Sequence, residues 1–294
     1  MIFYRRLPHF EYLAPHTIEG AISALREQPE ATRVIAGGTD LLLEMRRRDV
    51  TPERLLGLSN IPGIDYLKYG ETDGLRLGAM ATLSAVEKSP LVREKYPVLF
   101  QAVHGMASEQ VRNIATVTGN LCTALPSADT APALLVLDAT LEITGPGGKR
   151  VVAIADFFKD YRRTALEKGE ILTGIRLPAA NGSRGVYLKH RLRKAMSLPV
   201  AGVAVLLKEE GGVCRDVRIA LGAVAPSPIR AVGAEDWLRG AKLTKAAILE
   251  AARLAAEAAS PISDIRASAE YRRELVAVFT RRALAQLSGR EALS

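Results

Sequence analysis

The sequence predicts an α+β protein of two domains. Its 294 residues exceed the usual size of a single domain, and the loop-forming segment 181–183 separates two regions of different texture. Before this segment, short apolar strands alternate with helical patterns. After it, long alternating strands are followed by helices. We therefore expect one domain over residues 1–178 and a second over residues 183–290.

The first domain is expected to consist of two subdomains, residues 1–58 and 59–178. In the first, apolar residues recur at helical spacing, and Thr17 is placed to cap that helix. The expected elements there are a helix over 17–27, a strand into Gly37, a helix through Met45 and a strand near 55–58. Those of the second subdomain are a strand over 75–79, helices over 96–106 and 129–137, and a hairpin turn at 145–148.

The second domain is expected to contain a small antiparallel sheet packed with helices. Residues 200–208 and 213–224 have the pattern of two paired strands joined by a glycine-bearing turn. Residues 244–259 and 268–287 follow with alanine and leucine on one helical stripe. The simplest interpretation is a three-stranded sheet backed by these two helices.

Two glycine-bearing turns, residues 36–41 (A-G-G-T-D-L) and residues 115–120 (A-T-V-T-G-N), stand out within the first domain. Each follows an apolar or β-prone run and precedes a helical pattern. Glycine lets the main-chain N–H groups approach a ligand closely, and the N-terminus of a following helix favours a phosphate. Two such turns in one half of a chain indicate two sides of one pyrophosphate site.

Common nucleotide-binding motifs do not account for these turns. The first turn has adjacent glycines and no third glycine, which does not fit the G-x-G-x-x-G of a Rossmann domain. The sequence also has no G-x-x-x-x-G-K-[ST] motif, so a P-loop is excluded. The remaining alternative for either turn alone is a tight strand-to-helix connection without a ligand.

The longer context of the second turn, residues 110–134, resembles the flavin-binding subunit or domain of the xanthine dehydrogenase and carbon monoxide dehydrogenase family of molybdenum hydroxylases. In that family the run is typically A-[ST]-[IV]-G-G-N-[IL]-x-x-A-x-P-x-[AS]-D, and A-G-G-T-D-L matches its first flavin motif. The resemblance continues through residues 171–178 and 187–189. One departure is Thr118-Gly119 in place of the double glycine. A β-branched residue resists positive φ, so Thr118 either has an allowed conformation or marks a shifted loop.

The resemblance implies an FAD-binding domain of the vanillyl-alcohol-oxidase/PCMH type, followed by a C-terminal domain of the carbon monoxide dehydrogenase flavoprotein type. The implied function is that of an electron-transfer subunit of a multi-subunit molybdenum hydroxylase. Its FAD would take electrons from iron–sulfur clusters of a partner and pass them to an external acceptor. The alternative is a stand-alone FAD-dependent oxidase or dehydrogenase of the same superfamily, which the lack of an acid–base pair in the sequence disfavours.

The resemblance also assigns residues to the cofactor. Residues 34–41 would follow the diphosphate through their N–H groups, and the Thr116 hydroxyl would donate to phosphate from the opposite side. Asp129 would accept hydrogen bonds from cofactor hydroxyls, although it could instead cap the helix that follows. The full implied set is Val34, Ile35, Ala36, Gly37, Gly38, Thr39, Asp40, Leu41, Met106, Thr116, Gly119, Asn120, Thr123, Asp129, Leu172 and Lys189.

Three of these residues would surround the flavin ring. Lys189 falls where the family places a lysine beside the flavin, and a positive charge there would stabilise the anionic reduced ring. Alternatively, Lys189 simply belongs to the basic run of residues 189–194. Leu172 would pack near the ring. Met106 occupies a position where relatives often have an aromatic residue.

The two cysteines, Cys122 and Cys214, are too few for an iron–sulfur cluster, and we expect both to be small buried core residues. The resemblance therefore implies that the molybdenum cofactor and [2Fe-2S] clusters lie on partner chains. These would be a large molybdenum-binding subunit and a small iron–sulfur subunit, assembled as a dimer of heterotrimers. The first flavin motif has no histidine, so the FAD is expected to be non-covalent.

The net charge of +8 raises the alternative of nucleic-acid binding. Aromatic residues make up only 5% of the chain and none lies within the basic runs 46–48 and 189–194, so stacking platforms are missing. A basic run is more often a solvated face or a docking surface. No apolar stretch approaches the ~20 residues of a membrane span, and we expect a cytoplasmic protein.

Overall fold

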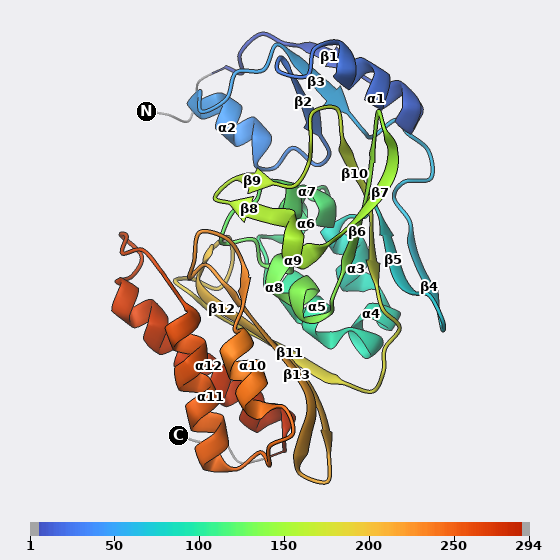
Figure 1. Cartoon of the computed structure of the whole chain (residues 1–294). Helices are drawn as coiled ribbons and strands as arrows, with labels where there is room; N and C mark the ends of the chain where they lie inside the picture. The colour runs from blue at the N-terminus through green and yellow to red at the C-terminus, as the bar shows by residue number, and fades with distance from the viewer. Residues whose placement is uncertain (1–5, 290–294) are drawn as a thin grey trace.

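The N-terminal part is a small α/β unit in the computed structural model, which describes residues 6–289 (Figure 1). Its sheet has the order β1-β3-β2, and both pairings are parallel because a helix connects each strand to the next. Helix α1 begins after Thr17, whose hydroxyl accepts the Gly20 N–H at 3.0 Å, as expected for an N-cap. The elements are β1 (Glu11–Leu13), α1 (Ile18–Glu27), β2 (Thr32–Ile35), α2 (Leu41–Arg47) and β3 (Arg54–Gly57).

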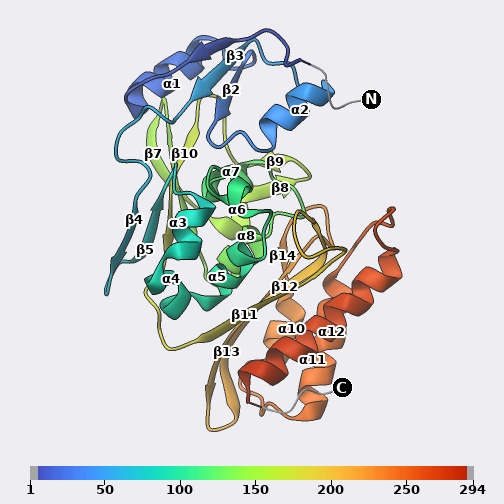
Figure 2. The ribbon, with the colours of Figure 1, turned by 180° about the vertical axis from the view of Figure 1, so that it is seen from behind.

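The middle part is a five-stranded antiparallel sheet with helices on one face, best seen in Figure 2. The strand order is β4-β5-β10-β6-β7, from Leu67–Gly70, Gly74–Gly78, Ile171–Leu177, Thr140–Gly145 and Gly148–Ala153. The helices are α3 (Leu83–Lys88), α4 (Pro90–Lys95), α5 (Pro97–His104), α6 (Glu109–Arg112), α7 (Val117–Cys122), α8 (Thr130–Val136) and α9 (Ile154–Phe157). A hairpin of β8 (Phe158–Asp160) and β9 (Arg163–Thr164) completes it. Buried Leu75, Leu77 and Leu141 pack this sheet against the helices.

The C-terminal part has four strands rather than the expected three. The sheet order is β11-β12-β13-β14, and the additional strand β14 consists of only two residues, Ile229–Arg230, paired with the end of β13. A two-residue strand is too short to produce an alternating pattern. The other elements are β11 (Arg184–Arg191), β12 (Pro199–Glu210), β13 (Val213–Gly222), α10 (Val232–Leu238), α11 (Lys245–Ala258) and α12 (Ala269–Leu287).

The C-terminal sheet is covered on both faces. Helices α12 and α10 pack on one face, with α11 lying against both of them, and α5 and α8 of the middle part pack on the other. The expectation that the helices over 244–259 and 268–287 back the sheet together is therefore wrong for the first of them. This explains why β12 is buried along most of its length. The sheet therefore joins the C-terminal part firmly to the middle part, as both views show (Figures 1 and 2).

Candidate cofactor site

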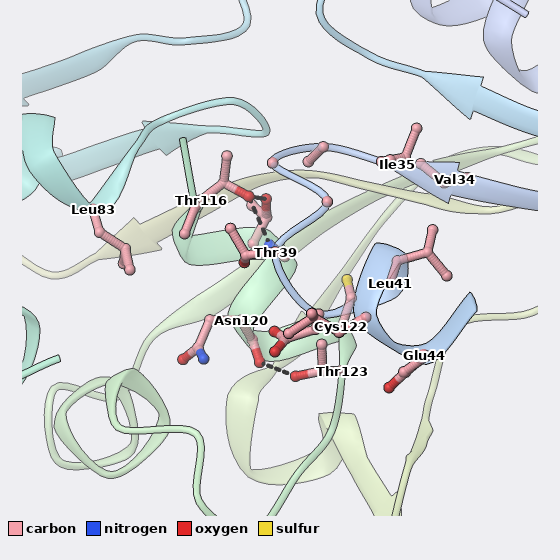
Figure 3. Close-up of a pocket in the computed structure, with 18 of the residues that line it drawn as sticks. Val34, Ile35, Thr39, Leu41, Glu44, Leu83, Thr116, Asn120, Cys122 and Thr123 are labelled. Carbon is pink, nitrogen blue, oxygen red and sulfur yellow. Dashed lines mark hydrogen bonds between the residues drawn. The ribbon is translucent and has the colours of Figure 1, made fainter. Parts of the chain in front are cut away.

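The two glycine-bearing turns meet in the structure, although many residues separate them in the chain. The main chain of Gly37 packs directly against Ile114, just before the second turn, and a Cβ on Gly37 would lie only 2.1 Å from the Ile114 carbonyl oxygen. Glycine is therefore required here by the contact between the turns. Beside this contact lies a cavity of about 720 Å³, whose lining is drawn in Figure 3.

The first turn presents a row of main-chain donors to the cavity. Gly38 has a φ of +69°, which bends the chain between β2 and α2. In the part of the chain that the structure describes, the N–H groups of residues 37–40 donate to no protein acceptor. Asp40 precedes α2 without a capping hydrogen bond from its side chain. Burial raises the pKa of the Asp40 carboxyl, and the nearby Arg162 and Arg47 offset this only in part.

The second turn is held by its own threonines. The Thr116 hydroxyl accepts the Gly119 N–H at 3.0 Å and so caps α7. Thr118, which replaces a glycine of the family motif, lies within α7 and has no positive φ. Its hydroxyl donates to the Ala79 carbonyl at 2.5 Å. Thr118 therefore has an allowed conformation and anchors the turn to the end of β5.

Asp129 is the centre of a buried polar cluster at the wall of the cavity. Its Oδ1 accepts the Tyr187 hydroxyl at 2.7 Å, and its Oδ2 accepts the Lys189 ammonium at 2.8 Å. Lys189 Nζ also donates to the Gly105 carbonyl at 3.1 Å. Burial raises the pKa of Asp129 against the opposing effect of Lys189. Burial and the Asp129 carboxylate together raise the pKa of Tyr187 well above its ordinary value.

The alternative role of Asp129 as a helix cap is wrong. Its side chain makes no capping hydrogen bond to α8. Instead, Asn120 Oδ1 accepts the Thr130 N–H at 3.4 Å and the Thr130 hydroxyl at 2.6 Å. The side chain of Asn120 therefore satisfies the start of α8, and the oxygens of Asp129 serve Tyr187 and Lys189.

Every residue assigned to the cofactor from the sequence lines this cavity, except Lys189. The Lys189 side chain is 5% exposed and lies behind Asp129, in an ion pair between β11 and the residue before α8. Lys189 therefore does not belong to a solvated basic face, and the run 189–194 is not one continuous basic surface. This buried position argues against the nucleic-acid alternative.

Sequence reasoning missed several lining residues because they reach the cavity only through tertiary folding. Arg162 lies in the turn between β8 and β9 with a φ of +57° and forms an ion pair with Glu44 of α2. Residues 196–198, in the loop between β11 and β12, approach from the C-terminal part. No periodicity or motif marks these positions, since each stands in an irregular turn.

Only one of the two cysteines is a core residue as expected. Cys214 is fully buried in the C-terminal core. Cys122 is exposed and lines the cofactor cavity, so its expected burial was wrong. The protein atoms around the cavity reduce the hydration of this thiol and raise its pKa to about 12. Cys122 at the end of α7 is therefore a neutral thiol beside the site at ordinary pH.

Among the described residues, no three histidine, cysteine or acidic side chains gather as a metal site would require. Within the same residues, no helix is long and apolar enough to cross a bilayer.

Comparison with known proteins identifies the family of the chain. Residues 8–180 match the FAD binding domain in molybdopterin dehydrogenase, and residues 186–287 match the CO dehydrogenase flavoprotein C-terminal domain. The chain belongs to this family. It is an FAD-binding subunit of the oxidoreductase type, and its relatives are subunits of molybdenum hydroxylases.

The similarity to individual relatives extends over nearly the whole chain. The carbon monoxide dehydrogenase medium chain of Afipia carboxidovorans is 34% identical, covering 96% of this chain and 97% of that protein. The glyceraldehyde dehydrogenase medium chain of Sulfolobus acidocaldarius is 31% identical, covering 96% and 99%. The solved carbon monoxide dehydrogenase from Hydrogenophaga pseudoflava superposes with a TM-score of 0.93 at 32% identity, covering 97% and 99%. Quinoline 2-oxidoreductase from Pseudomonas putida gives a TM-score of 0.90 at 31% identity, covering 97% and 98%.

Proposed function

We propose that this chain receives electrons from an iron–sulfur partner, holds them on a non-covalent FAD and delivers them to an external acceptor. The observation that carries the proposal is the row of unpaired main-chain donors at residues 37–40, which opens into a cavity of about 720 Å³. Such donors match the oxygens of a diphosphate, and the volume is typical of a cofactor pocket. The family match agrees with the same cofactor.

The proposed contacts follow from the chemistry of the lining. The N–H groups of residues 37–40 would hold the diphosphate. The Thr116 hydroxyl, which accepts from Gly119, would donate its proton there in place of its 3.3 Å contact with the Thr118 hydroxyl. Asp129 retains lone pairs toward the cavity for cofactor hydroxyls. Met106 and Leu172 supply apolar surface. When bound, the flavin supplies one- and two-electron redox chemistry.

Lys189 is proposed to influence the cofactor through Asp129 rather than by contact. Its ammonium favours the ionised form of Asp129 and so opposes burial, which raises the pKa of this carboxyl. Asp129 can therefore accept hydrogen bonds at neutral pH with both oxygens. Tyr187 fixes the orientation of the same carboxylate.

The iron–sulfur partner is proposed to dock at the end of the C-terminal sheet next to the cavity. Exposed apolar side chains gather on the two loops there, namely Leu192, Met196, Leu198, Ile262 and Ile265. Arg272 ties the loops together, since it donates to the Val200 carbonyl at 2.6 Å and to Asp264 at 2.7 Å. Residues 196–198 also line the cavity, so a partner bound here would lie close to the flavin.

The wider assembly in our proposal is a dimer of heterotrimers with a large molybdenum-binding subunit. We propose a domain boundary between residues 178 and 183, in agreement with the two matched regions. We place the assembly in the cytoplasm, since both cysteines are free thiols, the state that a reducing compartment maintains.

Copurification of the tagged chain with its partners tests the proposal. We expect a yellow complex containing iron and molybdenum, whereas the isolated chain should bind FAD but oxidise no organic substrate. The double variant Leu198→Arg/Ile265→Arg should lose the iron–sulfur partner and keep its flavin. Trp237→Arg, at another exposed apolar residue on α10, is the control and should retain the partner. Substrate oxidation by the isolated chain would contradict the subunit role.

A further inference from the structure

A second cavity, of about 370 Å³, lies on the other face of the five-stranded sheet. Its walls come from β5, β6, β7, β10 and the loop before β4, and the start of α1 closes one end. Buried Leu75 and Leu77 of β5 point into the helical core, so Arg76 between them points to this second cavity. The cofactor cavity and this cavity are thus separate sites.

Two glycines lie in the sheet beneath the side chains that line this cavity. Gly78 of β5 pairs directly with Gly174 of β10 in the middle of the sheet. A Cβ on Gly174 would lie 2.8 Å from Glu142 Oε2 and 3.1 Å from the Tyr66 hydroxyl. Glycine within a central strand weakens the strand, and it often marks a close approach of other groups. Because Gly174 has no side chain, the side chains of Glu142 and Tyr66 can lie across the sheet at this position.

Among the side chains that line this cavity, positive charges outnumber negative charges. Arg76 Nη2 lies 3.3 Å from Glu142 Oε1, and Arg176 Nε contacts the same oxygen. One carboxylate therefore serves two guanidinium groups on neighbouring strands. Within the described residues, Lys149 at the rim forms no ion pair, and Arg76 Nε is buried without a hydrogen-bond partner.

Hydroxyl groups complete the lining. Thr144 and Thr173 lie on neighbouring strands with their hydroxyl oxygens 2.9 Å apart. An ordinary solvent-facing sheet surface carries interspersed charges and no hollow. The sheet face at this cavity combines a hollow, two guanidinium groups that share the Glu142 carboxylate, and three hydroxyl groups.

We propose that this cavity binds a small phosphorylated anion. Arginine guanidinium groups bind phosphate oxygens through paired, charge-assisted hydrogen bonds, and Arg76 and Arg176 are already placed side by side on paired strands. The Tyr66 hydroxyl can donate to the remaining oxygens. The Thr144 and Thr173 hydroxyls, which hydrogen-bond to each other and to the Glu142 carbonyl, would rotate to do so. Glu142 competes with the anion for both arginines and so sets the affinity. The volume suits a ligand no larger than a mononucleotide.

Calorimetric titration of inorganic pyrophosphate into the full chain, saturated with FAD, tests the proposal. Saturating FAD occupies the other phosphate-binding cavity, so the titration reports on this one. We expect one saturable site per chain. Arg76→Gln and Arg176→Gln should each weaken binding about tenfold, the loss typical of one charge-assisted pair. Glu142→Gln should strengthen binding several-fold, because it releases both arginines.

Arg184→Gln is the matched control. Arg184 is also an exposed strand arginine paired with a single glutamate, Glu209, at 3.0 Å, but it lies on the C-terminal sheet. The Arg184→Gln variant should bind pyrophosphate with the same affinity as the wild type. Flavin content and melting temperature verify the folding of each variant. Arg176→Lys keeps the positive charge but loses the two-pronged guanidinium group, so its affinity for pyrophosphate should fall between those of the wild type and Arg176→Gln.

Three results would overturn the proposal. The first is the absence of saturable pyrophosphate binding to the FAD-loaded wild type. The second is an equal loss of binding in Arg184→Gln, or weaker binding in Glu142→Gln. The third is sulfate binding as tight as pyrophosphate binding, which would indicate a general anion surface rather than a phosphoryl site.

Discussion

The two cavities of this protein are built for anions in opposite ways. The cofactor cavity offers the N–H groups of residues 37–40, while its charged lining is mostly acidic: Asp40, Glu44, Asp129 and Glu170 against Arg33 and Arg162. The cavity on the sheet uses long cationic side chains and one shared carboxylate. Main-chain donors are fixed by the fold and cannot titrate, whereas side-chain donors can move and can be tuned by a neighbour. The first arrangement suits a permanent cofactor, and the second suits an exchangeable ligand.

The largest expected effect comes from separating the two turns of the cofactor cavity. In Gly37→Ala the new Cβ would meet the Ile114 carbonyl oxygen at 2.1 Å, and this main-chain atom cannot move without its turn. We expect the affinity for FAD to fall about a hundredfold, as for a misplacement of about 1 Å in a preorganised site. Flavin fluorescence titration measures it. Gly147→Ala, whose Cβ would meet nothing within 4 Å, is the control, and unchanged FAD affinity in Gly37→Ala would show that the contact is not required.

Asp129→Asn should destabilise the protein more than its small change in shape suggests. Asparagine cannot neutralise the buried Lys189 ammonium, and breaking a buried ion pair costs about 3 kcal/mol. Urea unfolding of the flavin-free protein measures this loss. Lys189→Met in the same chain should recover much of it, because no buried charge then remains unpaired. If the double variant is no more stable than Asp129→Asn, the ion pair is not the cause.

The salt dependence of binding should separate the two cavities. Raising sodium chloride from 50 to 500 mM should weaken pyrophosphate binding at the sheet cavity about tenfold, since its exposed side-chain charges are screened. Binding of FAD should change by no more than about threefold, because main-chain donors and apolar contacts provide most of it. Equal salt dependence at both cavities would remove the distinction between them.

The smallest expected effect concerns Asp40 at the first turn. Burial raises its pKa in the folded state, so its carboxyl binds a proton more readily when the chain is folded. Its contribution to stability is complete below the unfolded pKa and is lost as pH rises through the folded pKa. Asp40→Asn should therefore raise the free energy of unfolding at pH 7 by up to about 1 kcal/mol. The substitution should also flatten the pH dependence of the free energy of unfolding at pH values just above the ordinary pKa range of aspartate. Urea unfolding of the wild type at several pH values measures this dependence, and a free energy that does not change with pH there would contradict the prediction.

The sequence predicted those features that depend on neighbours along the chain. The two turns, the helix cap at Thr17 and the long strands of the C-terminal sheet follow from local rules. The position of Lys189 could not be predicted, because strand alternation gives a face but not the partner that covers it. Arg162 could not be found either, since it reaches the cavity only through the packing of a short hairpin against α2.

The burial of both faces of the C-terminal sheet also limited the sequence analysis. A strand that is apolar on both sides loses its alternation, so the pattern of β12 indicated a strand but not what packs against it. The expectation that Cys122 is buried was wrong for a different reason. The usual burial of free cysteines suggested a core position, whereas Cys122, at the end of the short helix α7, is exposed to the cavity.

The lining of the cofactor cavity extends from Arg33 to Leu198 in the chain, and this distribution constrains how the protein is made. During synthesis, the first turn emerges long before the loop that closes the opposite wall. A nascent chain that ends anywhere before that loop has only part of the cavity and cannot retain flavin with full affinity. Cofactor capture is thus a late step of biogenesis, and it stabilises only chains that have already been extended past Leu198. Flavin uptake in this way acts as a checkpoint against truncated products.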